Sequence, residues 1–224
     1  MFSVYEVKAR LVPALLCSVP FLAFGYFFLA DIDSGFTQIL FAQAIGGIGT
    51  MAAMFLFLAF VGRHLGTWIQ DTMFNEGDRF PTTLLLLDNS NTLSEERKQQ
   101  LRNKVKIDFD IDLSNRRDDT PQNRQRIGEG VSHIRKKFFG KSGLALQRNI
   151  EFGMAKNIAG GSIVALPVSI VITVISFSAS MTSLFYLGLV MAATYALMIA
   201  FGLKAMGTNA KRYATALFEE YLAS

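Results

Sequence analysis

The sequence predicts an integral membrane α-helical protein, in which two transmembrane hairpins (four spans) flank an inserted α+β cytoplasmic domain. Two apolar stretches are the basis for this fold class. The first runs from Leu11 to Gly62 with only two charges, Asp31 and Asp33, and the second runs from Ile158 to Leu203 with none. Because a helix needs about 20 apolar residues to cross a bilayer, each stretch supplies two spans.

A short polar segment divides each stretch and predicts a turn, at Asp31 to Gly35 and at Ser178 to Ser183. The first apolar stretch is longer than the core of a signal peptide, so we expect it to be retained. Pro13 and Pro20 are expected to kink the first span. The expected spans are Leu11–Ala30, Phe36–Val61, Ile158–Phe177 and Leu184–Leu203. The expected segments are an N-terminal hairpin (1–62), a cytoplasmic domain (63–157), a C-terminal hairpin (158–203) and a cytoplasmic C-terminal helix (204–224).

The basic residues predict the orientation. Of the 22 lysines and arginines, 17 lie between Arg63 and Lys156, and the two short turns contain none. Since cytoplasmic flanks of membrane spans are enriched in lysine and arginine, both termini and the middle segment are expected on the cytoplasmic side.

The middle segment is expected to mix helices with a strand. Thr92 or Ser94 is suited to cap a charged helix whose narrow apolar face includes Leu101 and Val105. The segment from Ile107 to Leu113 alternates apolar and acidic residues, which is typical of a half-buried strand. Pro81 is expected to prevent a helix, so that the leucines after it form a strand or an extended segment.

Several kinds of chemistry find no support in the sequence. The alternating Asp108, Asp110 and Asp112 resemble a calcium loop only distantly, because Leu113 and Asp119 stand where that loop needs glycine and glutamate. The single cysteine, Cys17, argues against a thiolate metal cluster. No phosphate-binding glycine loop and no nucleophile with a base is present, so we expect neither a metal, nor a cofactor, nor an enzyme.

A group of basic residues in the middle segment is the candidate ligand-binding site. Such charges, with neighbouring phenylalanines, suit a phosphate-rich ligand such as an oligonucleotide. They suit equally a surface held against anionic lipid, and both interpretations remain open. The group consists of Arg116, Arg117, Arg124, Arg126, Arg135, Lys136, Lys137 and Lys141.

Two stripes of residues lie within the expected spans. Small residues in the second span, at spacings that let helices approach closely, are assigned to helix packing. Hydroxyl residues share one face of the third span and are assigned to a pore lining, although a packing seam explains them as well. The packing stripe is Ala42, Gly46, Gly49, Thr50 and Ala53; the hydroxyl stripe is Ser162, Ser169, Thr173 and Ser176. Four helices are few to enclose a pathway, which favours a homo-oligomer.

Parts of the middle segment resemble a known group of proteins. Arg79 to Thr83, Thr92 to Ser94 and Gln147 to Gly153 are similar to segments of small bacterial four-helix membrane proteins from anti-phage defence systems, such as the Hailong membrane effectors and the Kiwa membrane proteins. The resemblance covers about a third of the chain. It implies the bacterial inner membrane, a tetrameric channel, control by a single-stranded oligonucleotide, and abortive infection as the outcome.

The resulting hypothesis is an oligomeric membrane effector that forms an ion-conducting pore gated through its basic cytoplasmic domain. The alternative is a non-conducting membrane sensor or scaffold that recruits a cytoplasmic partner protein encoded nearby. An enzyme assembled at a subunit interface is a weaker third option.

Overall fold

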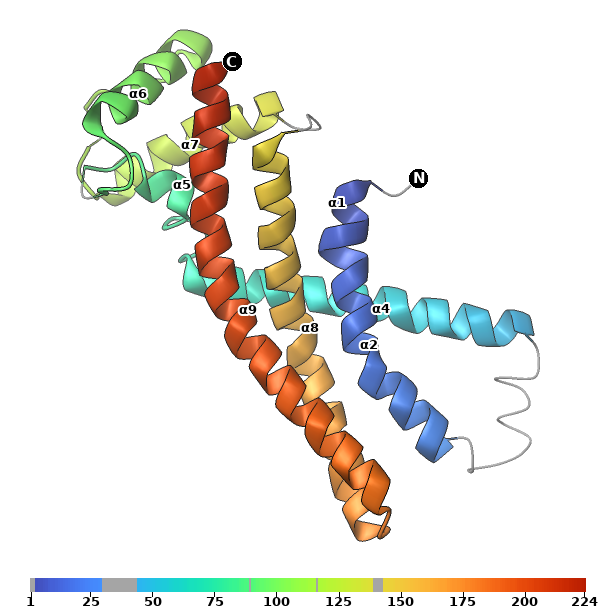
Figure 1. Ribbon diagram of the computed structural model, residues 1–224. Helices are drawn as coiled ribbons and strands as arrows, with labels where there is room; N and C mark the ends of the chain where they lie inside the picture. The colour runs from blue at the N-terminus through green and yellow to red at the C-terminus, as the bar shows by residue number, and fades with distance from the viewer. Residues whose placement is uncertain (1–2, 30–43, 89, 116, 139–142) are drawn as a thin grey trace. The chain divides into compact units, whose positions relative to one another are not determined.

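The computed structural model describes residues 3–29, 44–88, 90–115, 117–138 and 143–224, without the side chains of 28–29, 44–48, 50 and 51 (Figure 1). Every regular element in these ranges is a helix. In chain order the elements are α1 (Val4–Glu6), the π-helix η1 (Val7–Leu11), α2 (Val12–Phe24), the π-helix η2 (Gly25–Leu29), α4 (Ala44–Met73), α5 (Pro81–Leu84), α6 (Glu95–Phe109), α7 (Pro121–Phe138), α8 (Leu144–Ser178) and α9 (Thr182–Ala223).

The chain forms two compact units. We call Met1–Ile69 with Gly153–Ala205 the membrane unit, and Gln70–Phe152 with Met206–Ser224 the charged unit. The long helices α8 and α9 contribute residues to both.

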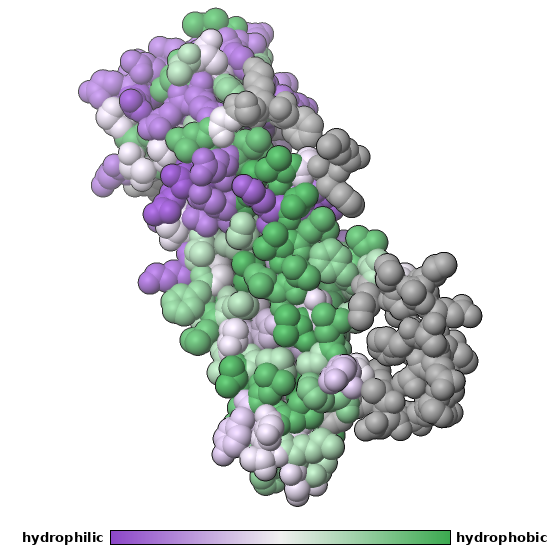
Figure 2. Space-filling view, turned by 45° about the vertical axis from the view of Figure 1, so that its right-hand side comes forward, coloured by the Kyte–Doolittle hydropathy of each residue, from purple (hydrophilic) through white to green (hydrophobic). Residues whose placement is uncertain are grey.

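Four described helices are long and apolar enough to cross a membrane, which confirms the expected number of spans by length and composition. They are Val4–Phe27, Ala52–Met73, Leu144–Ser178 and Thr182–Ala223. Hydrophobic side chains dominate the visible surface of the membrane unit (Figure 2), and Phe57, Phe60, Phe177 and Phe201 are exposed on it. Such a surface is expected of helices that contact lipid. The predictions for residues 30–43, which include the first turn and the start of the second span, concern residues outside those that the structure describes.

The α+β prediction for the middle segment is wrong, because the described residues contain no strand. The alternating segment begins as the last turn of α6, which ends at Asp110 with a left-handed φ of 56°. Ile107 is 82% exposed on that turn, whereas Ile111 and Leu113 are buried beyond it. The alternation therefore comes from a helix end followed by an irregular segment.

The leucine run after Pro81 also forms no strand. Pro81 occupies the first position of α5, where its missing N–H leaves no helical bond unmade. Leu85, Leu86 and Leu87 continue from α5 in turns and are buried. Pro81 was expected to prevent a helix, but it starts a short one.

The charged unit has a hydrophobic core of its own. Ser94 caps α6 by accepting a hydrogen bond from the Arg97 backbone N–H at 3.3 Å, as one of the two expected caps. The apolar face of α6, with Leu101 and Val105, is fully buried, as expected. The end of α9 completes the core, and Met206–Ser224 are part of this unit. Core residues from α9 are Ala214, Ala216, Leu217, Phe218 and Tyr221.

Pro20 leaves one carbonyl of α2 without its regular helical donor. A proline has no N–H, so Pro20 cannot donate to the Leu16 carbonyl four residues earlier. The Tyr195 hydroxyl of α9 donates to that oxygen instead, at 2.7 Å. Because a lipid-embedded carbonyl has no water to bond, this contact fixes α2 against α9.

A second carbonyl of the first span, seven residues before Leu16, is also bonded from another helix. Pro13 follows the π-helix η1, and the axis changes direction between α1 and α2 (Figure 1), in line with the expected kink. Pro13 cannot donate to the Ala9 carbonyl, and the Asn157 side-chain amide of α8 donates to it at 2.6 Å. The first span is thereby held against α8 as well.

Helices α4 and α8 approach each other closely at four glycines. A Cβ added at Gly62 would lie 3.3 Å from Gly161 Cα, and one added at Gly66 would lie 2.6 Å from the Lys156 carbonyl oxygen. A Cβ at Gly160 would overlap the Gly62 carbonyl and the Gly66 nitrogen. The two backbones are thus in direct contact, which only small residues permit.

Gly160→Ala should disrupt this crossing. The added methyl would overlap backbone atoms, which cannot rotate away, so we expect a loss of stability of about 3 kcal/mol or more, at the upper end for overpacking. Thermal unfolding in detergent measures the effect. The control is Gly49→Ala on α4, where an added Cβ meets nothing within 4 Å. Equal stability of the two variants would contradict the glycine crossing.

Tyr195→Phe should destabilise the membrane unit by about 1–3 kcal/mol, because the Leu16 carbonyl loses its donor. The cost should be much smaller in a Pro20→Ala background, where the restored N–H at position 20 bonds the same carbonyl. Unfolding of the two single variants and the double variant completes the cycle. Equal costs of Tyr195→Phe in both backgrounds would refute the proline explanation.

Candidate functional sites

The hydroxyl stripe of α8 lies inside the membrane unit of a single chain. Ser162, Ser169 and Ser176 are fully buried, and Thr173 is half-buried. Ser169 donates to the Ala165 carbonyl at 2.9 Å, and Thr173 donates to the Ser169 carbonyl at 2.8 Å. Both hydroxyls are thus satisfied within their own helix.

Neighbouring helices of the same chain cover this stripe. The Ser162 hydroxyl lies 4.0 Å from the Cys17 sulfur of α2. A Cβ at Gly188 of α9 would lie 2.5 Å from the Thr173 hydroxyl oxygen. Ser176 differs, because its buried hydroxyl has no partner among the described residues. The stripe is therefore a contact surface of α8 with α2 and α9 in this structure.

The two members of the small-residue stripe whose surroundings are described, Gly49 and Ala53, make no such contact with a described residue. Gly49 and Ala53 are exposed, and nothing lies within 4 Å of a Cβ at Gly49. Ala42, and the side-chain surroundings of Gly46 and Thr50, lie outside what the structure describes. The assignment of this stripe to packing stays a prediction for contacts with another molecule.

The contact that α4 does make was missed by sequence reasoning. It falls at Gly62 and Gly66, opposite Gly160 and Gly161. A spacing of four between two glycines near the end of an apolar run was the available signal.

Most residues of the predicted basic group are engaged within the charged unit. Buried Arg124 donates to Asp78 at 2.7 Å and also pairs with Asp119. These carboxylates raise the pKa of Arg124, with the Asp119 hydrogen bond as the main cause. Arg126 pairs with Glu129 at 2.7 Å. Their charges are therefore balanced locally.

The remaining residues of the basic group differ in whether they make a polar contact with another described residue. Arg135 donates to the Thr82 hydroxyl at 3.0 Å, and its guanidinium lies 5.2 Å from the centre of the Phe80 ring. Lys137 pairs with Asp108 at 2.8 Å. Lys136 is exposed and forms no ion pair with a described residue. Arg117 is exposed and donates to the Ser114 carbonyl at 3.3 Å, whereas Arg116 and Lys141 lie outside the described residues.

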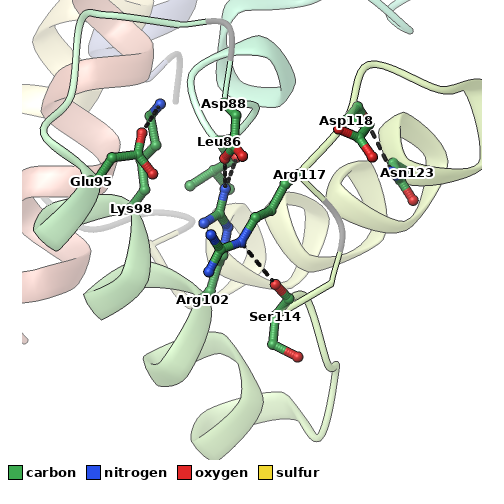
Figure 3. A network of polar contacts seen from close by, with 9 residues as sticks. All are labelled: Leu86, Asp88, Glu95, Lys98, Arg102, Ser114, Arg117, Asp118 and Asn123. Atoms are coloured by element: carbon green, nitrogen blue, oxygen red, sulfur yellow. Dashed lines mark hydrogen bonds and ion pairs between the residues drawn. The ribbon is translucent and has the colours of Figure 1, made fainter.

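Two cations of α6 are buried, and one of them, Arg102, holds the preceding segment in place (Figure 3). Arg102 donates to the Leu86 carbonyl at 2.6 Å and to Asp88 at 3.1 Å. Lys98 has a fully buried side chain that donates to Glu95 at 2.6 Å. Sequence reasoning did not single out either residue, because a charged residue between apolar ones gives no signal of burial.

The acidic side chains after α6 also take part in local contacts. Asp112 accepts hydrogen bonds from Lys106 at 2.8 Å and from the Ser114 hydroxyl at 2.6 Å. Among the described residues, no three His, Cys, Asp or Glu side chains gather where they could hold a metal ion. Asp108 and Asp112 therefore act as ion-pair partners in this structure.

No protein-family model matches the chain, and neither the curated proteins nor the solved structures contain a match.

Asp112→Asn should make the charged unit less sensitive to acid. The Asp112 carboxylate accepts hydrogen bonds from Lys106, which is the main cause, and from Ser114. These bonds hold the pKa of Asp112 below its ordinary value of 3.8. A carboxyl group with a lowered pKa stabilises the fold above its unfolded pKa, and this contribution is lost as the pH falls toward the folded pKa. We expect the wild type to lose more stability than the variant between about pH 6 and about pH 3. Circular dichroism melts over this range measure it.

Asp118→Asn is the control for this experiment, because the exposed Asp118 side chain makes no hydrogen bond with a described residue. It should keep the pH dependence of the wild type. The same slope in Asp112→Asn and Asp118→Asn would show that the Asp112 contacts contribute nothing.

Proposed function

We propose that this protein is a membrane-embedded sensor or scaffold that recruits a cytoplasmic partner protein through its charged unit. The supporting observation is the burial of the hydroxyl stripe. Ser162, Ser169 and Ser176 are fully covered by helices of the same chain. A hydroxyl face that is covered in this way serves helix packing, whereas a pore lining has to face an open pathway.

The charged unit supports recruitment of a protein over binding of a phosphate polymer. Its basic residues alternate with acidic partners, as in the pairs of Arg126 with Glu129 and Lys137 with Asp108. Phosphate polymers select surfaces with many unpaired cations. A mixed-charge surface over a separate hydrophobic core favours a protein partner with complementary charges.

The orientation follows from the distribution of basic residues. With 17 of the 22 lysines and arginines between Arg63 and Lys156, the charged unit faces the cytoplasm. We propose a bacterial inner membrane as the location, on the basis of the resemblance to defence-associated proteins. A signal that alters the membrane unit would there change the affinity for the partner.

A pore is the second candidate function, and the unpaired hydroxyl of Ser176 favours it. A buried hydroxyl without a partner costs about 1–3 kcal/mol, which a water-filled pathway would relieve. In this alternative a homo-tetramer conducts ions along α8 after α2 or α9 has moved away from the stripe. The basic residues would then gate it by binding an oligonucleotide.

Ion flux into liposomes that contain only the purified chain separates the two functions. Ser169→Leu would not separate the scaffold from the pore. Ser169 is buried, so the larger side chain would disturb packing whichever function is correct. Ser169→Ala with Thr173→Val removes both hydroxyls at nearly constant volume. We expect no flux from the wild type and none from the double variant.

Flux from the wild type that this double variant reduces would contradict the scaffold and support the pore. The assay includes a lipid-only control and is repeated with a single-stranded oligonucleotide present. Unfolding curves of the wild type and the double variant show whether both are folded.

A further inference from the structure

A crevice in the membrane unit brings two arginines and a buried amide together. Three of the four candidate spans contribute to it, through Arg10, Arg63 and Asn157. Pro13, Ala14 and Leu58 provide apolar lining. It is a narrow crevice: its empty space of about 170 Å³ includes open solvent at the mouth, and its interior has no room for a water molecule. Arg10 and Arg63 flank the expected spans Leu11–Ala30 and Phe36–Val61, where lipid headgroups lie, so their convergence indicates an anionic ligand.

The crevice carries excess positive charge. Arg63 is exposed and forms no ion pair with a described residue. Arg10 has only the Glu6 carboxylate, at 3.6 Å, and lies over the Tyr5 ring. Glu6 is in turn bonded to Ser3, which closes the capping box of α1. Of the two guanidinium groups, only that of Arg10 is paired with a carboxylate among the described residues.

Asn157 adds an unsatisfied acceptor. Its amide nitrogen is fixed as the donor to the Ala9 carbonyl, which also fixes which side-chain atom is the oxygen. That oxygen has no partner among the described residues, although Asn157 is only 6% exposed. A buried acceptor without a donor costs about 1–3 kcal/mol, so a ligand with a hydroxyl group would improve the site.

We propose that this crevice binds the headgroup of an anionic glycerophospholipid. The phosphate lies at the mouth between the guanidinium groups of Arg10 and Arg63, which suit phosphate oxygens. A headgroup hydroxyl donates to the Asn157 side-chain oxygen. Because the crevice is narrow, the lining side chains have to move apart to admit it. The acyl chains extend along the apolar side near Leu58.

The chemistry of the lining selects a lipid among phosphate compounds. A free phosphate would need only the arginines, whereas the apolar side chains of Pro13, Ala14 and Leu58 favour a ligand with hydrocarbon attached. Phosphatidylglycerol has the phosphate, the net negative charge, the hydroxyls and the acyl chains. Phosphatidylcholine has the same phosphate without net charge or headgroup donor.

Native mass spectrometry of the delipidated protein in detergent tests this site. We expect phosphatidylglycerol to bind in preference to phosphatidylcholine, and Arg10→Gln and Arg63→Gln each to weaken its binding about tenfold or more, which is about 1.4 kcal/mol. Arg63→Lys should retain most of the binding. The matched control is Lys8→Gln, since Lys8 is an exposed cation of η1 that does not line the crevice.

Three results would overturn the proposal. They are equal binding of the two lipids, an equal effect of Lys8→Gln and Arg63→Gln, and competition by soluble glycerol phosphate as strong as that by the lipid. The last result would show a site for phosphate alone. Unfolding curves of each variant confirm that lost binding is not lost folding.

Discussion

Every backbone carbonyl in a lipid environment needs a donor from the protein, and this requirement determines how the membrane unit is assembled. Pro20 leaves the Leu16 carbonyl of the first span without its regular donor, and the Ala9 carbonyl of the π-helix η1 is also bonded from outside its helix. Asn157 supplies one bond from α8 and Tyr195 supplies the other from α9. Apolar packing alone would allow α2 to slide along its neighbours, but two directed bonds fix its position.

The position of α2 decides the environment of the hydroxyl stripe. With the first span held at Ala9 and Leu16, Cys17 lies against Ser162, and the cluster around it includes Ile172 and Met191. The stripe is thus covered from one side by α2 and from the other by α9. A pathway along it would require breaking the two carbonyl bonds, so gating by small adjustments of α8 alone does not follow from this structure.

The sequence predicted what depends on the bilayer or on local hydrogen bonds, namely the number of spans, the cap at Ser94 and the buried face of α6. It failed where tertiary contacts decide. The alternation that suggested a strand is a helix end at Asp110, because only the backbone reversal there brings Ile111 into the core. Some of the predicted basic residues pair with acidic residues distant in sequence, such as Arg124 with Asp78. A count of charges along the sequence could not predict these pairs.

Asn157 links the architecture of the membrane unit to the proposed lipid site. An amide has both a donor and an acceptor, so using its nitrogen to satisfy Ala9 leaves an oxygen that still needs a donor. A bound headgroup would complete the hydrogen bonds of Asn157 and neutralise Arg10 and Arg63, and it would do so only while α2 is in place. The lipid would therefore stabilise the packed arrangement over any state in which α2 has moved away.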